Sequence, residues 1–217
     1  MTTRLKIDFV SDVSCPWCVI GLASLERALE HIGDEVTADI RFQPFELNPN
    51  MPPEGQDIAE HIAQKYGSSP EELQRNQEAI RERGEALGFA FNMGKRSRIY
   101  NTFDAHRLLH WAALEGSQHA LKRALFTAYF TDGRDPSDRD VLIDVAKQAG
   151  LDPARAREVL ESGAYAEEVR EREQLFRQHG IDAVPSVIIN DQYLIQGGQP
   201  VELFEQALRK IASEGTA

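Results

Sequence analysis

The sequence predicts an α/β protein in which a large block of helices interrupts a smaller unit built on a sheet. Three observations predict this class. Strand, helix and strand patterns follow one another in residues 1–45, only helical patterns fill residues 57–179, and strand patterns return after residue 185. The order is β-α-β, then helices, then β-β-α. Because the strands of one sheet bury their apolar faces in one core, we expect a large all-α domain inserted between the second and third strands.

The opening β-α-β unit is predicted from three segments. Residues 5–10 (LKIDFV) alternate imperfectly and predict a mostly buried strand. Pro16 suits the first turn of a helix, and the apolar spacing that follows predicts a helix ending at Gly33. Residues 36–45 alternate and predict a second strand, in which Pro44 ends the ladder of hydrogen bonds.

The middle block contains several helix starts. Ser69 precedes a proline and two acids, an arrangement that caps a helix and suits its electropositive end. Ser137 and Asp140 resemble a capping pair, and Asp152 precedes another proline. Helices are expected at about residues 58–66, 69–87, 102–115, 117–129, 137–149, from 152 onward, and 165–179.

The C-terminal β-β-α unit completes the pattern. Residues 186–189 and 193–195 predict two strands, and the residues Asn190-Asp191-Gln192 between them are typical of a hairpin turn. Two glycines at 197–198 then break the chain, and Pro200 predicts the start of the last helix.

The charge balance limits the classes of partner. The 217 residues carry 35 acidic against 24 basic side chains, a net charge of −11. Because a phosphate-binding surface needs cations, neither nucleic acid nor an anionic membrane is an expected partner. No run of eighteen apolar residues predicts a membrane span, and the first residues lack the pattern of a secretory signal. We therefore expect a cytoplasmic protein.

The two cysteines of the chain stand together in the stretch DVSCPWCVIG. If Pro16 opens the helix, Cys15 lies at its N-cap and Cys18 lies one turn in, on the same face and within reach of a disulfide. The electropositive helix end stabilises a thiolate at Cys15. Cys15 is thus the predicted nucleophile and Cys18 the resolving thiol, with Trp17 offering an aromatic face beside the sulfurs.

A structural disulfide or a zinc site accounts less well for the cysteine pair. A disulfide that closes so short a loop stabilises a fold by only about 2 kcal/mol, and a chain of this length does not need it. A Cys₂His₂ zinc site would have to use His106 and His110, which are spaced for one helix face but are far along the chain from the cysteines. We therefore expect redox chemistry with no metal and no bound cofactor.

The motifs together resemble a known family. The stretches SDVSCPWCVIG, PFELNP, AHRLLHWA, ALFTAYF, GIDAVPSVIIN and GGQP occur in order along nearly the whole chain. They resemble the DsbA-like thioredoxin superfamily and, within it, the FrnE-type branch of predicted dithiol-disulfide isomerases. The resemblance implies a thioredoxin-like fold, with residues 1–55 and 180–217 forming the thioredoxin-like domain and residues 56–179 the inserted helical domain.

The resemblance also implies roles for residues outside the dithiol. Pro185 is the expected cis-proline opposite the cysteines, and the backbone of Val184 is expected to pair with a substrate chain. Pro16 and Trp17 are expected to contact the substrate. Asn101 and His106 fall in a family stretch of the insert and are expected to face the active-site cleft.

One position departs from the family pattern. Thioredoxins and DsbA carry a buried acid six residues before the nucleophile, where it assists proton transfer from the resolving thiol. Here that residue is Phe9. Strand alternation sends Asp8 to the opposite face, so water and Asp12 are the candidates for deprotonating Cys18.

We expect a thiol-disulfide oxidoreductase or isomerase that acts on thiol- or disulfide-containing proteins or small molecules, with glutathione as a possible co-substrate. The cytosolic glutathione poise favours reductase or isomerase work over net oxidation. One alternative is a glutathione-dependent transferase or isomerase, similar to the kappa-class transferases and the hydroxychromene-carboxylate isomerases, which typically have serine in place of Cys15. A second alternative is a non-catalytic redox-sensing or client-binding module.

Overall fold

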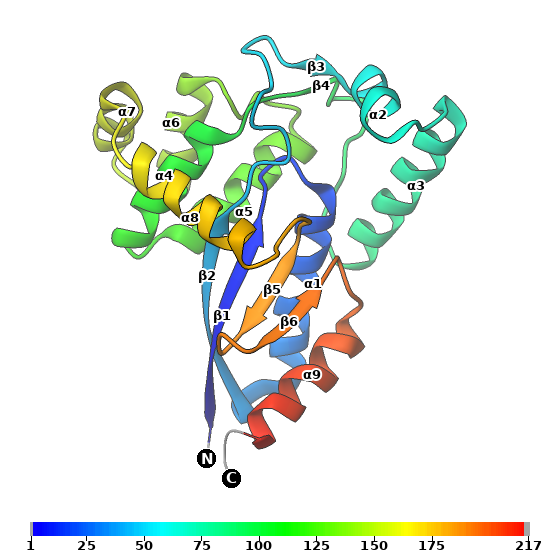
Figure 1. Ribbon diagram of the computed structural model, residues 1–217, viewed down its shortest axis with the longest axis vertical. Helices are drawn as coiled ribbons and strands as arrows, with labels where there is room; N and C mark the ends of the chain where they lie inside the picture. The colour runs from blue at the N-terminus through cyan, green and yellow to red at the C-terminus, as the bar shows by residue number, and fades with distance from the viewer. Residues whose placement is uncertain (1, 215–217) are drawn as a thin grey trace.

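The computed structural model describes residues 2–214, within which four strands form the main sheet (Figure 1). The strand order is β2-β1-β5-β6. β1 pairs with β2 in parallel and with β5 antiparallel, and β5 and β6 form an antiparallel hairpin. The strands are β1 (Thr3–Ser11), β2 (Val36–Pro44), β5 (Ser186–Ile189) and β6 (Tyr193–Gln196).

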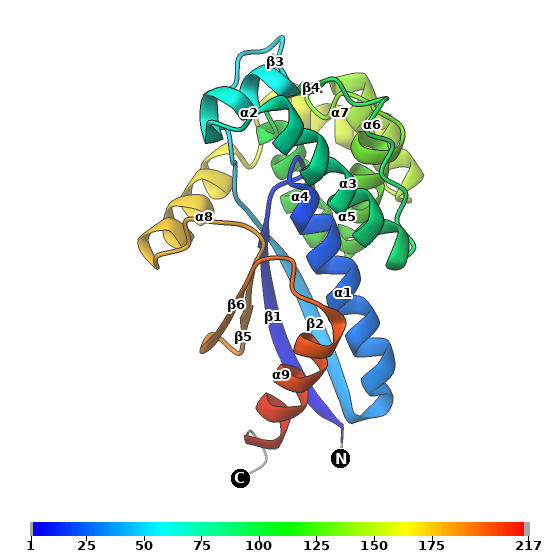
Figure 2. The ribbon, with the colours of Figure 1, turned by 90° about the vertical axis from the view of Figure 1, so that its right-hand side faces the viewer.

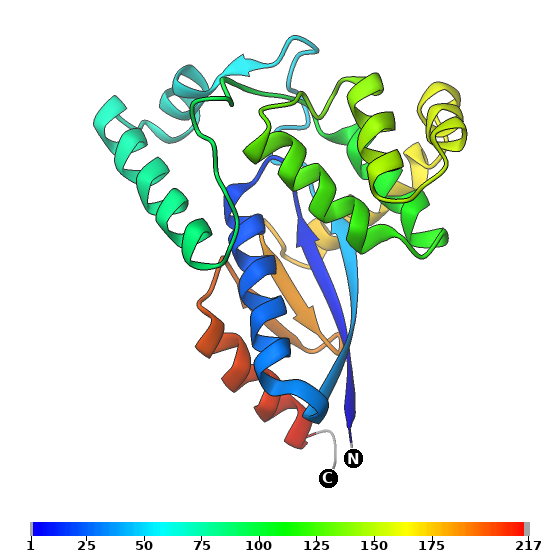
Figure 3. The ribbon, with the colours of Figure 1, turned by 180° about the vertical axis from the view of Figure 1, so that it is seen from behind.

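Helices α1 (Pro16–Ile32) and α9 (Val201–Glu214) pack side by side on one face of the sheet, as Figures 2 and 3 show. α8 (Ala166–Gln178) lies on the opposite side, near the end of β2. α1 ends where the sequence predicts: Gly33 adopts a φ of 60° and donates its N–H to the carbonyl of Leu29. The predicted α/β class, with helices inserted between the second and third strands of the sheet, is confirmed.

The inserted segment contains helices, the loops that join them and two short strands. Its other helices are α2 (Ile58–Tyr66), α3 (Pro70–Ala86), α4 (Phe103–Leu114), α5 (Gln118–Phe126) with a π-helical continuation (Thr127–Thr131), α6 (Arg139–Gln148) and α7 (Pro153–Ser162). The expectation of an all-α insert is wrong in one respect, because β3 (Gln56–Asp57) and β4 (Arg98–Ile99) form a two-stranded sheet. Strands of two residues are too short to show a period of two.

The caps of the inserted helices agree with the sequence at α3 and differ at α6. Ser69 and Glu72 form a reciprocal capping box at the start of α3, as predicted. At α6 the predicted pair is wrong: the carboxylate of Asp138 accepts the N–H groups of Asp140 and Val141. Ser137 instead donates its hydroxyl to a neighbouring carboxylate in the preceding turn.

The inserted helices share cores with the sheet. Phe126, Tyr129 and Phe130 belong to the same apolar cluster as β1, β2, β5, α1 and α9. A second cluster joins Val13, just after β1, to Leu108 and to neighbouring residues of the insert. The domain boundaries at residues 55/56 and 179/180 stay predictions. No helix within residues 2–214 is long and apolar enough to cross a bilayer.

Candidate active site

Cys15 and Cys18 lie at the start of α1. Cys15 is the N-cap residue, with φ −92° and ψ 114°, and Pro16 follows as the first helical residue. The N–H of Cys18 donates to the carbonyl of Cys15 over 3.1 Å. Both thiols are free; Cys15 is 4% exposed and Cys18 is fully buried. Only the first sulfur of the pair is therefore near the surface.

The segment before β5 meets Cys15. The Val184–Pro185 peptide bond is cis, and the Cys15 thiol donates to the carbonyl oxygen of Val184 over 3.7 Å. The Pro185 ring packs on α1 at Gly21, where an added Cβ would stand only 3.0 Å from Pro185 Cγ. A side chain at position 21 would therefore press on the loop that presents the Val184 carbonyl.

Trp17 forms the rim beside the dithiol. Its side chain is half-buried, and an added Cβ on Gly198 would stand 3.2 Å from the indole. The guanidinium of Arg83, from α3 of the insert, stacks 5.2 Å from the Trp17 ring centroid and donates to the Gly198 carbonyl. The insert thus contributes directly to the surface around the dithiol.

Asp12 organises the turn between β1 and α1. Its buried carboxylate accepts the N–H of Leu47 (2.7 Å), the N–H of Ser14 (3.2 Å) and the hydroxyl of Thr102 (2.7 Å). Burial alone would raise its pKa, but the nearby His106, together with the hydrogen bonds from Leu47 and Thr102, lowers the pKa of Asp12 to about 2. So weak a base does not suit proton removal from Cys18, which counts against one of the two acceptors suggested by the sequence.

His106 and Asn101 contact groups other than the cysteines. Nε2 of His106 lies 3.5 Å from Oδ1 of Asp12. The Asn101 amide donates to Glu46 and to the carbonyl of Pro49, and its oxygen accepts the N–H of Phe103. Both residues hold the turns around the dithiol in place, and their contact with a substrate stays a prediction.

The space beneath the dithiol holds no carboxylate at the usual position. Phe9 is fully buried and packs edge-to-face against Phe42, with ring centroids 5.8 Å apart. Asp8 points to the other face of the sheet, where it pairs with Lys6 and Gln43. The expected orientation of Asp8 is therefore correct.

A lysine that the sequence patterns did not single out acts on the buried thiol. Burial, followed by the hydrogen bond and charge of Cys15, raises the pKa of Cys18 well above its ordinary value, and the charge of Lys122 opposes this rise. Lys122 lies on α5, one helical turn before Phe126 and on the same apolar face as Leu125. A lysine at such a core position is the sequence signal that could have identified it.

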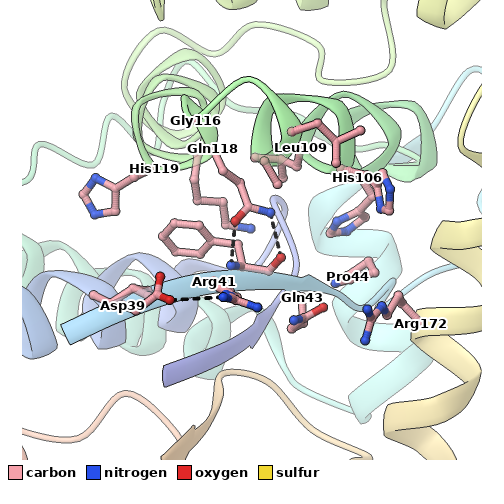
Figure 4. A pocket seen from close by; sticks show the side chains of 16 residues that line it. Asp39, Arg41, Gln43, Pro44, His106, Leu109, Gly116, Gln118, His119 and Arg172 are labelled. Atoms are coloured by element: carbon pink, nitrogen blue, oxygen red, sulfur yellow. Dashed lines mark hydrogen bonds and ion pairs between the residues drawn. The ribbon is translucent and has the colours of Figure 1, made fainter. Parts of the chain in front are cut away.

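A pocket of about 540 Å³ opens between β2 and helices α4 and α5, and His106 lines it (Figure 4). Lys122 also lines this pocket. Gln118 fastens α5 across this pocket to the edge strand: its amide accepts the N–H of Phe42 and donates to the Phe42 carbonyl, both over 2.9 Å. Within residues 2–214, no three His, Cys, Asp or Glu side chains are arranged to hold a metal ion.

The sheet, the dithiol at the start of α1 and the Val184 carbonyl beside it define a thiol oxidoreductase of the thioredoxin fold. A family model of the DSBA-like thioredoxin domain matches residues 6–209. The chain therefore belongs to the DsbA-like thioredoxin family.

Individual relatives agree with this family. A probable DsbA oxidoreductase from Streptomyces coelicolor is 35% identical, with a TM-score of 0.88, over 95% of this chain and 89% of that one. The Bacillus subtilis protein YwbO is 29% identical, over 96% of each chain. The cytosolic disulfide reductase DsbM from Pseudomonas aeruginosa, solved with GSH, shares the fold at a TM-score of 0.66 and 17% identity, over 94% of this chain and 98% of that one.

Proposed function

We propose that this protein reduces or isomerises disulfides with the dithiol Cys15–Cys18, as a FrnE-type member of its family. The observation that carries the proposal is the position of Cys15. Its sulfur sits at the N-terminus of α1 and 3.7 Å from the Val184 carbonyl, with Cys18 one turn behind it. This sulfur is the one near the surface and is placed to attack a substrate disulfide, and the carbonyl provides a backbone acceptor for an extended substrate chain.

The reaction follows from this arrangement in two steps. The Cys15 thiolate attacks one sulfur of a substrate disulfide; a Cys15–substrate disulfide forms, and the other substrate sulfur leaves as a thiolate that takes up a proton. Cys18 then loses its proton and attacks Cys15. The Cys15–Cys18 disulfide forms, the bond to the substrate breaks, and the second substrate thiol is released.

The oxidised dithiol must then be reduced, and we propose that glutathione does this. Two glutathione molecules give up two electrons, becoming one glutathione disulfide, and both cysteines return to thiols. This direction suits a cytoplasmic protein, because the glutathione pool there is reducing and disulfides in that compartment are usually transient. Cell fractionation tests the location, and recovery of the protein outside the cytoplasm would contradict it.

The test is turnover of a protein disulfide such as that of insulin with glutathione as reductant. Wild type should turn over, Cys15→Ser should be inactive, and Cys18→Ser should accumulate a mixed disulfide with the substrate, detectable by mass spectrometry. Wild-type protein that cycles between dithiol and disulfide without reducing insulin or a small disulfide would contradict the proposal and favour a redox-sensing module.

The glutathione transferase or isomerase alternative gives a different result. A conjugation or isomerisation that uses bound glutathione needs no resolving thiol, so Cys18→Ser would keep that activity. Disulfide exchange needs Cys18, so we expect turnover to fall by at least a hundredfold in this variant, about 3 kcal/mol in transition-state terms.

A further inference from the structure

Lys122 is a buried lysine whose ammonium group has no hydrogen-bonding partner in the described part of the chain. Its side chain is 0% exposed, and Nζ makes no hydrogen bond within residues 2–214. Two aromatic rings face the ammonium, with Nζ 4.9 Å from the Phe126 centroid and 5.8 Å from that of Phe42. Aromatic faces stabilise an ammonium only in part, and an unpaired buried charge is unfavourable for folding. The position therefore calls for a compensating function.

Packed aromatic side chains connect Lys122 with the dithiol. Phe42, which faces Nζ, also packs on Phe9, the residue at the position where the family carries its acid. Phe9, Phe42, Phe126 and Cys18 belong to one apolar cluster. Through Phe42 and Phe9, packed aromatic rings link Lys122 on α5 to the apolar cluster that contains Cys18.

The charged and titratable groups that act on Lys122 are few. They are Cys18 and Cys15 of α1 and Asp12 of the preceding turn. The pocket that Lys122 lines also holds other charged or titratable side chains, from β2 (Asp39, Arg41), α4 (His106, His110), α5 (His119) and α8 (Arg172). Burial lowers the pKa of Lys122 to about 8, against the opposing effect of Cys18, Asp12 and Cys15. Asp12 is already held by Leu47, Ser14 and Thr102, so Cys18 is the group that gains a charge during the reaction.

We propose that Lys122 is the counter-charge for the Cys18 thiolate and so takes the place of the missing family acid. The inference rests on the proposed function. When Cys18 attacks the mixed disulfide, its proton passes through solvent to the departing substrate sulfur, and the Lys122 ammonium stabilises the negative charge on Cys18 meanwhile. Lys122 acts through Cys18 and is therefore a positioning residue for charge, not a group that touches the substrate.

Ellman's reagent separates the two thiol steps without a natural substrate. Cys15 attacks the reagent and releases the first thionitrobenzoate, and Cys18 then attacks the Cys15 mixed disulfide and releases the second. In Lys122→Met we expect the second release to be at least tenfold slower at pH 7 and the first to change less than threefold. Lys147→Met, the same change at an exposed site of the insert, should leave both rates unchanged.

The pH profile distinguishes a charge effect from a packing effect. The advantage of wild type over Lys122→Met in the second release should be largest below pH 8 and shrink above it, as the amine loses its proton. Lys122→Arg keeps its charge at every such pH and should hold the advantage. Equal second-release rates in wild type and Lys122→Met, or equal slowing of both releases, would overturn the inference.

Two provisions keep the test decisive. If Lys122→Met does not fold, Lys122→Gln replaces it. The pH profile of wild type is a second test that needs no variant. A rate of second release that rises in proportion to hydroxide concentration from pH 7 through pH 9 overturns the inference. Failure of the proposed function would show separately, as absent insulin turnover by wild type, because the Ellman reaction requires no protein substrate.

Discussion

Asp12 shows at the residue scale how one buried carboxylate supports the active-site turn. Its partners Leu47, Thr102 and His106 come from the loop after β2 and from the start of α4. They hold the segment before Cys15 in place from these two elements. Removing the charge leaves buried donors with a poorer acceptor, which is unfavourable.

We predict that this carboxylate makes stability depend on acid pH. The pKa of Asp12 falls from 3.8 to about 2 on folding. The unfolded chain binds the proton more readily, so the contribution, about 2 kcal/mol, is complete above pH 4 and is lost as pH falls through 2. In urea unfolding, Asp12→Asn should be less stable than wild type at pH 5, and the difference should narrow by that amount near pH 2. Asp34→Asn, at an exposed position, is the control, and a difference independent of pH contradicts the prediction.

Lys122 should have the opposite effect on stability at alkaline pH. Its pKa falls from 10.5 to about 8 on folding, so the unfolded chain binds more protons between these values and stability rises with pH there. Below pH 8 the buried charge destabilises the fold by about 3 kcal/mol. Lys122→Met should therefore be more stable than wild type at pH 7 in urea unfolding, with a gain that shrinks toward pH 10. A constant gain would show that packing, not charge, is responsible.

The residues of the site differ in how far the sequence could reveal them. Cys15, Pro16 and Cys18 are neighbours in the chain, so the geometry of the first helical turn fixes their relative positions. The contacts of Asp12 with Thr102 and of Cys15 with Val184 join residues 90 and 169 positions apart. Such contacts depend on tertiary packing, which no local pattern reports, and the same is true of the burial of Lys122 against Phe42 and Phe126.

At the scale of elements, most helices and strands lie where local patterns predict. Long periodic segments such as α1 and α3 have recognisable start or stop residues, and β1 and β2 have apolar residues that alternate with polar ones. β3 and β4 have only two residues each and form because Gly55 lets the chains approach: a Cβ there would stand 2.5 Å from the Ile99 carbonyl oxygen. A glycine of this kind is recognisable only once its neighbour is known.

The start of α6 gives a direct test of the corrected cap. Asp138→Ala removes the acceptor of two helix N–H groups and should destabilise the protein by about 1 kcal/mol. Ser137→Ala, at the residue that the sequence pattern favoured, should have a smaller effect because its hydroxyl contacts only the preceding turn. Urea midpoints of the two variants decide the matter, and a larger effect for Ser137→Ala would make Ser137 the cap after all.

At the scale of the whole molecule, the inserted helices and the sheet are packed as one unit. Apolar side chains of the π-helical continuation fill the core beneath the sheet, and Val13 enters the core of the insert. The insert also supplies Arg83 above Trp17 and Gln118 at the edge of β2. Because they share these contacts, the inserted helices and the sheet should not unfold separately.

We predict a single cooperative unfolding transition. The chain has two tryptophans, Trp17 beside the dithiol and Trp111 buried in the insert. In Trp17→Phe, fluorescence reports the insert alone, whereas far-UV circular dichroism reports the whole chain. The two urea curves should coincide, as two-state behaviour requires. Separate midpoints would show that the insert is an independent folding unit.

The long sequence separation between Cys15 and Val184 has a consequence during synthesis of the chain. A ribosome that has released Cys15 must still add 169 residues before the carbonyl opposite it exists, and chains begin to fold from the N-terminus as they emerge. Nascent chains therefore carry two unshielded thiols for most of translation. A truncated mRNA that ends within the insert would therefore yield a fragment with two exposed thiols and exposed apolar surface. Such a fragment should aggregate and not act as an enzyme of reduced activity.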